Sequence, residues 1–222
     1  MEFELFLLIC NYIGTIAFAV SGVVKGFNKN LDIFGITLLG ILTAVGGGII
    51  RDMMTARIPA ALTDPTSIYL AIAVALIMYL FVITRKTNKL QHQQMYRFLA
   101  ITNLVFDAIG LAIFALIGAS AGVELHLNFM TSGILATLTG VGGGILRDLL
   151  VNETPIVLKE DVYAVLAFFA GIAYHILVLD FHLPRIPVYI ALFTIALVIR
   201  LLVIKYHVNL PNMSLKEKVS KK

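Results

Sequence analysis

The sequence has little charge and no tryptophan. Asp, Glu, Lys and Arg together make up only 14% of the 222 residues, whereas 59% of the residues are hydrophobic. A soluble domain of this length needs more charged residues to cover its surface. Without tryptophan, anchoring at a membrane–water interface falls to Tyr, Phe and the basic residues. The composition therefore predicts a membrane protein.

Patterns that would indicate a cofactor, a metal or a nucleic-acid partner are also missing. The only cysteine, Cys10, lies in an apolar run and cannot form an internal disulfide. The five histidines lack the spacing of a metal site, and no phosphate-binding or dinucleotide motif is present. The net charge of +4 does not indicate nucleic-acid binding, because the basic residues flank apolar runs. We expect no metal, no cofactor and no nucleic-acid partner.

Seven apolar runs are long enough to cross a bilayer, since a spanning helix needs about 20 mostly apolar residues. The first run is not a signal peptide, because two acidic residues precede it and it is too long for a cleaved apolar core. The expected fold is an all-α membrane protein with one transmembrane domain, 1–206, and a basic cytoplasmic tail, 207–222. The predicted spans are 4–26, 33–54, 66–85, 97–121, 129–151, 161–180 and 187–206.

The basic residues are divided unequally between the two sides of the membrane. Seven spans place the termini on opposite sides, and all but three of the 17 Lys and Arg residues fall on the side of the C-terminus. The exceptions are Arg51, Arg57 and Arg185. The positive-inside rule therefore predicts that the N-terminus lies outside the cell and the C-terminus in the cytoplasm.

The first six spans are two copies of one three-helix unit. A shift of 96 residues aligns the segment 45–52 with 141–148, including three glycines and an Arg-Asp pair. The copies are residues 5–86 and 97–182, and the seventh span, 187–206, has no counterpart. Because each copy has three spans, the second copy begins from the opposite side of the membrane. Inverted repeats of this kind are typical of transporters with a working site near the midplane.

Triple glycines occupy equivalent places just past the middle of spans two and five. Consecutive glycines remove side-chain support from a helical turn. Within a membrane, a broken turn is tolerated only where protein or water satisfies its backbone groups. The favoured interpretation is a kink or break beside a polar pathway; close helix packing is the alternative, and both can hold together. The residues are Gly46, Gly47, Gly48, Gly142, Gly143 and Gly144.

Each triple glycine is followed by a charged pair, Arg51-Asp52 or Arg147-Asp148. Charge inside a span is costly and by default indicates function. If the helix restarts after the glycines, the aspartates fall in the first turn of a half-helix, where a carboxylate is favoured. Adjacent helical residues point about 100° apart. Each arginine is therefore expected to find its partner elsewhere, for example in the opposite repeat. A structural ion pair or interfacial snorkelling is the alternative.

Other polar residues inside the spans are candidates for a pathway. Asn11 and Asp107 are repeat equivalents, and Asp107 is the most deeply placed acid, which must face the interior, be paired or be protonated. Thr43 and Thr139 precede the glycines by the same spacing and are the favoured hydroxyls, although most such hydroxyls bond to their own helix.

One pair of residues weakly resembles the active site of an intramembrane protease. Ser120 in span four and His175 in span six follow the serine–histidine order of rhomboid proteases. However, the glycines around Ser120 are explained by the repeat, and no oxyanion-stabilising device is visible. The sequence therefore predicts no enzyme.

Seven spans, an inverted repeat and a doubled Gly-Gly-Gly-x-x-Arg-Asp element resemble the bacterial relatives of the trimeric intracellular cation (TRIC) channels, also grouped as a glycine transporter domain family. The resemblance covers residues 5–206. It implies a homotrimer with a pore in each protomer, lined by spans two and five and bent at the triple glycines, that passes potassium and other monovalent cations. The gating lysine of animal members has no counterpart in span four. The basic cluster Arg85, Lys86 and Lys89 lacks the family's phosphoinositide motif and implies only generic attraction to anionic lipids.

Three functions stay open at this point. The first is a potassium-permeable channel in the inner membrane of a bacterium. The second is a secondary carrier for a small neutral solute such as glycine, which the inverted repeat suits equally well. The third is a scaffold or lipid-interacting protein without flux, against which the standing cost of the intramembrane charges argues.

Overall fold

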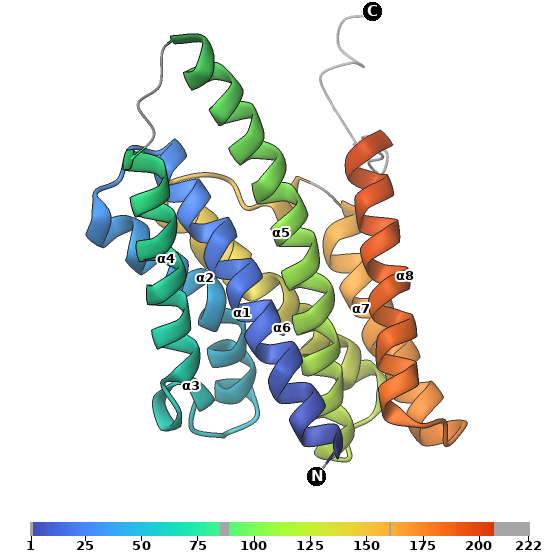
Figure 1. The fold of residues 1–222 in the computed structure, drawn as a ribbon. Coiled ribbons are helices and arrows are strands. Elements are labelled where there is room, and N and C mark those ends of the chain that lie inside the picture. The colour runs from blue at the N-terminus through green and yellow to red at the C-terminus, as the bar shows by residue number, and fades with distance from the viewer. Residues whose placement is uncertain (1, 85–88, 160, 207–222) are drawn as a thin grey trace, which may run out of the picture.

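The computed structural model describes residues 2–84, 89–159 and 161–206, and these residues contain helices and no strands (Figure 1). Seven helical segments are long and apolar enough to cross a membrane, as predicted. Arg85, Lys86 and the predicted tail, 207–222, lie outside the described residues. The spanning segments are α1 (Glu2–Asn28), α2 (Ile33–Met54), α4 (Thr66–Thr84), α5 (Lys89–Glu124), α6 (Phe129–Leu150), α7 (Asp161–His175) continued by the π-helical turn η2 (Ile176–Asp180), and α8 (Arg185–Tyr206).

The bounds follow the hydropathy pattern closely, with one clear difference. α5 begins at Lys89 rather than at residue 97, and its first turns rise above the neighbouring helices in Figure 1. The segment 89–96 contains no glycine or proline and several good helix formers, so the helix continues past its apolar part. Two short helices, α3 (Ala60–Thr63) and the 3₁₀-helix η1 (Ile156–Leu158), follow the repeat-equivalent prolines Pro59 and Pro155.

The sequence repeat is reproduced in the local structure of the helix ends. Asp32 caps the start of α2 by accepting a hydrogen bond from the Gly35 N–H, and its equivalent Asn128 caps α6 in the same way through Thr131. The residues that follow helix ends in the left-handed conformation also come in equivalent pairs. These pairs are Asn30 with His126 and Ala56 with Asn152.

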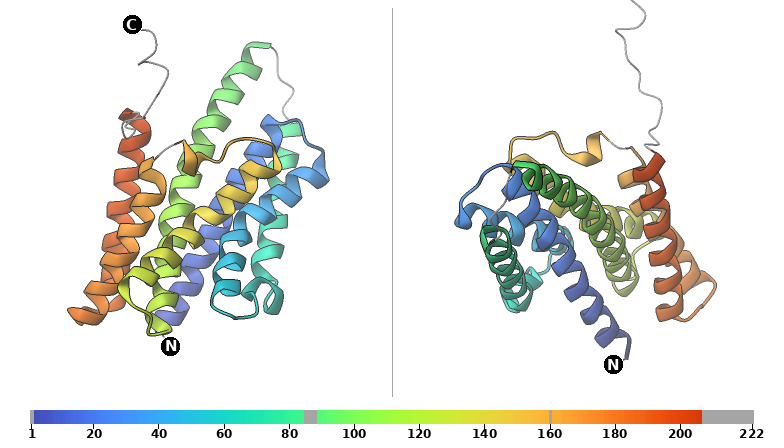
Figure 2. Two further views of the ribbon diagram at one scale, coloured as in Figure 1. Left: turned by 180° about the vertical axis from the view of Figure 1, so that it is seen from behind. Right: turned by 45° about the horizontal axis from the view of Figure 1, so that its top comes forward.

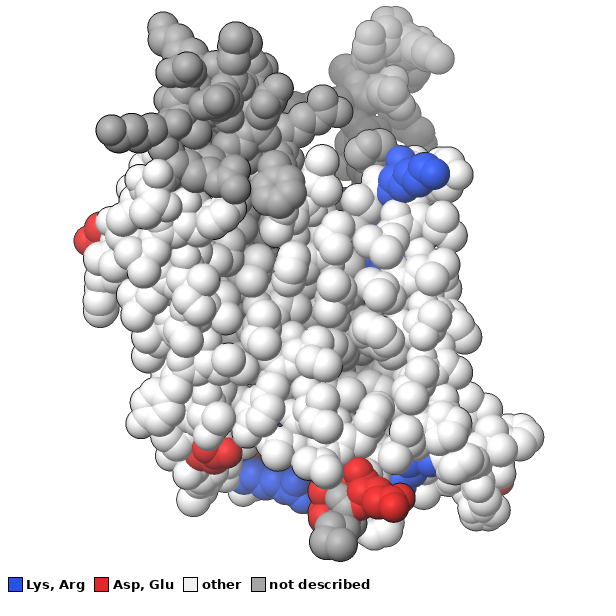
Figure 3. Space-filling model, viewed as in Figure 1, with Lys and Arg blue, Asp and Glu red and all other residues white. Residues whose placement is uncertain are grey.

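α5 is the central helix and packs against α1, α6, α7 and α8, while α2 packs between α1, α4 and α6. α4 and α8 lie at opposite edges of the bundle (Figures 1 and 2). We call the end of the bundle with Glu2, α3 and the start of α6 the lower face, and the end where α1 and α6 terminate the upper face. Charged side chains gather at the lower rim of the described surface, and the band above them is nearly uncharged (Figure 3). This band suits contact with lipid tails.

Candidate functional site

The two triple glycines meet where α2 packs against α6. A Cβ atom on Gly47 would overlap the carbonyl oxygen of Thr139, and a Cβ atom on Gly143 would overlap the carbonyl oxygen of Thr43. The two contacts are reciprocal, because both partners are repeat equivalents. Only glycine allows the backbones of the two helices to approach so closely.

Neither triple glycine interrupts its helix. α2 is helical from Ile33 to Met54, and α6 from Phe129 to Leu150. The predicted break is therefore wrong, and so is the half-helix that would start after it: Asp52 and Asp148 lie near the ends of continuous helices. A kink within these intact helices stays a prediction. The backbone of the partner helix supplies the packing that the missing side chains cannot, and an intact helix leaves no backbone group unsatisfied within the membrane.

Thr43 and Thr139 flank this crossing and are fully buried. Their hydroxyls donate to the carbonyl oxygens of Leu39 and Leu135 in their own helices, at 2.6 Å in both cases. Both hydroxyls are thus satisfied within the helix, which is the usual behaviour of threonine in a spanning segment.

Each arginine binds the aspartate next to it. Arg51 Nε lies 2.8 Å from Asp52 Oδ1, and Arg147 Nε lies 3.0 Å from Asp148 Oδ1. The expectation that each arginine avoids its neighbour is wrong, because the long arginine side chain folds back far enough to overcome the angular separation along the helix.

The second oxygen of each aspartate also has a matching partner in the two repeats. Asp52 Oδ2 accepts the N–H of Ala60 at 2.8 Å, and Asp148 Oδ2 accepts the N–H of Ile156 at 3.0 Å. Ala60 and Ile156 begin the short helices α3 and η1, so each aspartate ties the end of its long helix to the connection that follows.

Arg147 makes further contacts that join the two repeats near the upper face. Its Nη1 lies 2.6 Å from Asp107 Oδ1 and 2.5 Å from Ser21 Oγ, and the Ser21 hydroxyl donates to Asn103 Oδ1 at 2.7 Å. All four side chains are buried. Asp107 therefore faces the interior and is paired, one of the arrangements expected for it, and Arg147 has a partner in the opposite repeat.

A second set of ion pairs closes the upper face. Lys25 Nζ lies 2.6 Å from Glu153 Oε2 and 3.7 Å from Asp148 Oδ1, and Lys29 Nζ lies 2.7 Å from Glu153 Oε1. These contacts link the end of α1 to the end of α6 and its following loop. Hydrogen bonds from Lys25 and then Lys29 lower the pKa of Glu153 to about 2.

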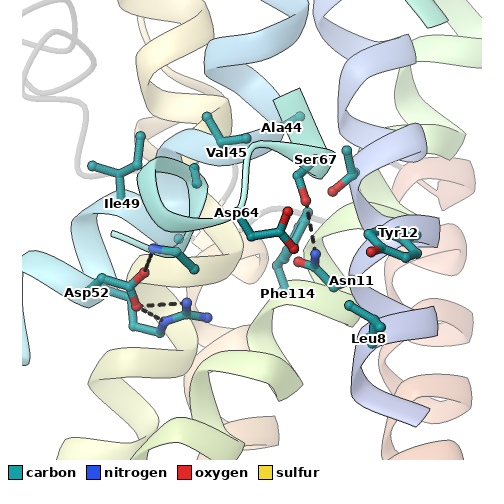
Figure 4. A pocket seen from close by; sticks show the side chains of 15 residues that line it. Leu8, Asn11, Tyr12, Ala44, Val45, Ile49, Asp52, Asp64, Ser67 and Phe114 are labelled. Carbon is teal, nitrogen blue, oxygen red and sulfur yellow. Dashed lines mark hydrogen bonds and ion pairs between the residues drawn. The ribbon is translucent and has the colours of Figure 1, made fainter. Parts of the chain in front are cut away.

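The lower face is more open around the equivalent pair. A pocket of about 170 Å³ lies between α1, α2 and α4, beside Arg51 and Asp52 (Figure 4). Asn11 lines this pocket and donates to Ser67 Oγ at 3.1 Å. A second pocket, of about 130 Å³, borders the other side of the same arginine and includes Glu124.

Two phenylalanines separate the lower pocket from the upper network. Phe18 and Phe114 are repeat equivalents, and their ring centroids lie 5.2 Å apart. Phe114 lines the lower pocket, whereas Phe18 lies against Gly110 and near Gly143. The rings and the glycine crossing therefore fill the middle of the bundle.

The predicted residues do not include Lys25, Asn103 and Glu153. Ser21 is one of the span hydroxyls expected mostly to bond to their own helix, and it contacts Asn103 and Arg147 instead. Lys25 was counted only as a loop charge. Glu153 is the repeat equivalent of Arg57, and this reversal of charge was the signal that could have identified it. The pairing of Ser120 with His175 that a protease would need does not form. His175 Nδ1 instead lies 2.8 Å from Ser132 Oγ, in a buried contact. Among the described residues, no group of three His, Cys, Asp or Glu could hold a metal ion.

Comparison with known families and sequences gives consistent matches. The profile of the family described as "Glycine transporter" matches residues 8–84 and again residues 104–178, in the register of the repeat. The UPF0126 inner membrane protein YadS of Escherichia coli (strain K12) is 34% identical over 206 residues, covering 92% of this chain and 95% of that protein. The UPF0126 membrane protein YvgT of Bacillus subtilis (strain 168) is 39% identical over 160 residues, covering 72% of this chain and 75% of that protein.

Solved structures share the complete fold. A crystal structure of a prokaryotic TRIC channel in 0.5 M KCl matches with a TM-score of 0.82 at 34% identity, covering 93% of this chain and 100% of that chain. The TRIC trimeric intracellular cation channel orthologue from Rhodobacter sphaeroides matches with a TM-score of 0.79 at 30% identity, covering 91% of this chain and 99% of that chain.

Proposed function

The chain belongs to the glycine transporter family, and because its solved structural neighbours are TRIC cation channels, we propose that it is a potassium-permeable channel for monovalent cations. The proposed assembly is a homotrimer in the inner membrane of a bacterium, with one pore in each protomer along α2 and α6. Exposed apolar side chains, such as Phe81 on α4 and Ile195 on α8, would face lipid or another protomer. The N-terminus, and with it the lower face, would lie outside the cell.

One observation carries the proposal: polar and charged groups of both repeats lie at the two ends of the α2–α6 crossing, one set toward each face. The lower pocket reaches Arg51 and Asp52, the glycines and phenylalanines occupy the middle, and the network around Arg147 occupies the upper end. Buried charges in a membrane are costly, so their concentration at the two ends of one crossing supports a permeation pathway.

In this proposal the structure represents a closed channel. The Phe18–Phe114 pair blocks the middle, and Lys25 with Glu153 blocks the upper end. Opening would require the two repeats to separate around the glycine crossing, where Leu146 packs against Gly46 and Ile50 packs against Gly142. Because α2 and α6 are continuous, the glycines would act as a close contact surface rather than as broken turns.

A carrier for a small neutral solute such as glycine is the second candidate. It is favoured by the family description and by the difference between an open lower face and a closed upper face, which is the form of one state of an alternating-access carrier. The channel is preferred because the structural neighbours that match almost the whole chain are cation channels.

The test is electrical recording from the purified full chain in planar bilayers with asymmetric potassium chloride. Unitary currents that reverse near the potassium equilibrium potential are expected. Bilayers that receive the same detergent without protein serve as the control. Electrical silence together with uptake of labelled glycine into matching liposomes would overturn the channel and establish the carrier.

A further inference from the structure

In the second repeat, the space beside Gly144 is filled by the positively charged side chain of Arg147. A Cβ atom on Gly144 would lie 3.2 Å from the Tyr163 hydroxyl, 3.7 Å from Arg147 Nη2 and 3.8 Å from Asp107 Oδ1. The guanidinium of Arg147 thus occupies this place and binds the Asp107 carboxylate. Tyr163 closes the site from the side of α7, and its ring in turn lies 4.6 Å from the Arg200 guanidinium of α8.

In the first repeat, the equivalent space beside Gly48 is open. A Cβ atom on Gly48 would meet only Arg51 Nη2, at 3.9 Å, and Gly48 lines the pocket of about 170 Å³. Arg51 does not fill this pocket as Arg147 fills its counterpart: its Nε and Nη2 atoms both lie 2.8 Å from Asp52 Oδ1, and the repeat equivalent of Asp107 is the uncharged Asn11. The bulky tyrosine of the upper site is replaced by Ser67. The repeat therefore leaves a vacant space where its other copy holds a cation.

Oxygen atoms without partners line this space. Thr15 is one of the residues that line the pocket, and its hydroxyl is fully buried and has no hydrogen-bond partner. Asn11 uses its amide nitrogen to donate to Ser67, which leaves the Asn11 Oδ1 atom available to a ligand. A buried hydroxyl without a partner is unfavourable unless something else binds it. The pocket thus offers two uncharged oxygen ligands from α1, and the Ser67 hydroxyl oxygen of α4 is a third.

The charge on the pocket wall is negative. Arg51 and Asp52 neutralise each other, and Asp64 adds one further carboxylate. Figure 4 shows the Asp64 side chain turned toward Asn11 and Ser67. Hydrogen bonds from the side chain and then the backbone of Thr66 lower the pKa of Asp64, so this carboxylate is ionised at neutral pH.

We infer that the lower pocket binds one monovalent alkali cation through the oxygens of Asn11, Thr15 and Ser67, with Asp64 as its counter-charge. The identity of the ligand rests on the proposed channel function, for which this would be the site of entry at the outer face. A single uncompensated carboxylate suits a monovalent ion, whereas calcium sites usually combine several carboxylates. A zwitterion fits less well, because two nitrogens of Arg51 are already bound to Asp52.

The test measures the thermal unfolding of the full chain in detergent while potassium chloride replaces choline chloride at constant ionic strength. A ligand that binds the folded state raises the unfolding temperature as its concentration rises. Asp64→Asn and Thr15→Val should each raise the half-saturating potassium concentration by about tenfold or more, since each removes an oxygen ligand or its charge.

Matched controls lie outside the pocket. Asp180→Asn removes an exposed carboxylate near the same face, and Thr194→Val removes a hydroxyl that bonds to Ile190 in its own helix. Both should keep the wild-type potassium response. Gly48→Ala, which fills part of the pocket without a clash, should weaken the response. Crystals soaked in thallium should show an anomalous peak beside Thr15.

The outcomes separate this inference from the channel itself. Potassium currents with no potassium-dependent stabilisation, or with the same stabilisation in all pocket variants, would overturn the site and leave the channel intact. Stabilisation that depends on Asp64 and Thr15 but without any current would support the site and overturn the channel. Stabilisation by glycine and not by potassium would overturn the cation site in favour of a zwitterion.

Discussion

Lys25 Nζ lies 2.6 Å from Glu153 Oε2, although 128 residues separate the two in the sequence. The contact joins α1 of the first repeat to the loop that follows α6 of the second repeat. Together with Lys29, it holds the upper ends of the two repeats against each other. The lower face has no equivalent clamp at these positions, because the repeat equivalents of Lys25 and Lys29 are Ala121 and Leu125.

Glu153→Gln should favour opening at the upper face. The substitution removes the charge that holds both lysines, so the probability of the open state in bilayer recordings should rise severalfold. The stability cost should be at most about 1 kcal/mol, because the carboxylate is partly exposed and screened. Glu2→Gln at the lower end is the control and should leave the open probability unchanged. An unchanged open probability in Glu153→Gln would show that the clamp does not control the pathway.

The contribution of this clamp should depend on pH in acid. The folded pKa of Glu153, about 2, lies below its ordinary value of 4.5. A carboxyl group with a lowered folded pKa stabilises the folded state above its unfolded pKa, and this stabilisation is lost as the pH falls through the folded pKa. The difference in unfolding temperature between wild type and Glu153→Gln should be constant above pH 5 and disappear toward pH 2. If this difference in unfolding temperature disappears near pH 6 or 7 instead, the titrating group is not Glu153.

The two arginines should differ strongly in their importance for stability. Arg147→Met leaves Asp107 and Asp148 buried without their partner, which typically costs about 3–5 kcal/mol. Arg51→Met should cost less, because Arg51 is 15% exposed and leaves one carboxylate, Asp52, without its ion-pair partner rather than two. Unfolding temperatures in detergent measure the difference. Adding Asp107→Asn to Arg147→Met should recover part of the loss, and equal losses in the two single variants would contradict the asymmetry.

Alanine at the middle glycine of each triplet should disturb the helix crossing. A Cβ atom on Gly47 or Gly143 would overlap a carbonyl oxygen of the partner helix, and overpacking of this kind costs about 1–3 kcal/mol. Gly48→Ala, whose Cβ has open space, is the matched control for stability. The measurement is the unfolding temperature of each variant. A Gly47→Ala protein as stable as Gly48→Ala would show that the two backbones are farther apart than described.

The phenylalanine pair should limit the unitary current. Phe114→Ala removes one ring from the middle of the proposed pathway and should increase the unitary conductance, at a cost of about 3–5 kcal/mol in stability. Phe169→Ala is the control, because Phe169 is 61% exposed on α7 and would face lipid or another protomer. An unchanged conductance in Phe114→Ala would place the narrowest point elsewhere.

The spans, their approximate bounds and the internal repeat were all predictable from the sequence. Hydropathy determines which segments can enter a membrane, and this requirement depends on each segment's own composition rather than on its neighbours. The same reasoning placed Asp107 in the interior, since a carboxylate on a lipid-facing surface would be too costly. The early start of α5 was missed because hydropathy detects only the part of a helix that lies in the membrane.

The shape of the glycine segments was not predictable in this way. Helix propensity assigns a cost to Gly46, Gly47 and Gly48 in isolation, but the backbone of α6 packs directly on α2 and offsets that cost. The ion-pair partner of each arginine was equally unpredictable from the sequence, because it depends on which atoms lie within reach after the helices pack. The sequence by itself determined a seven-span protein with two equivalent halves, since composition and periodicity are properties of each segment. Only the tertiary structure decided that Arg147 fills its site while Arg51 leaves a pocket, because which side chain reaches which partner depends on how the helices pack.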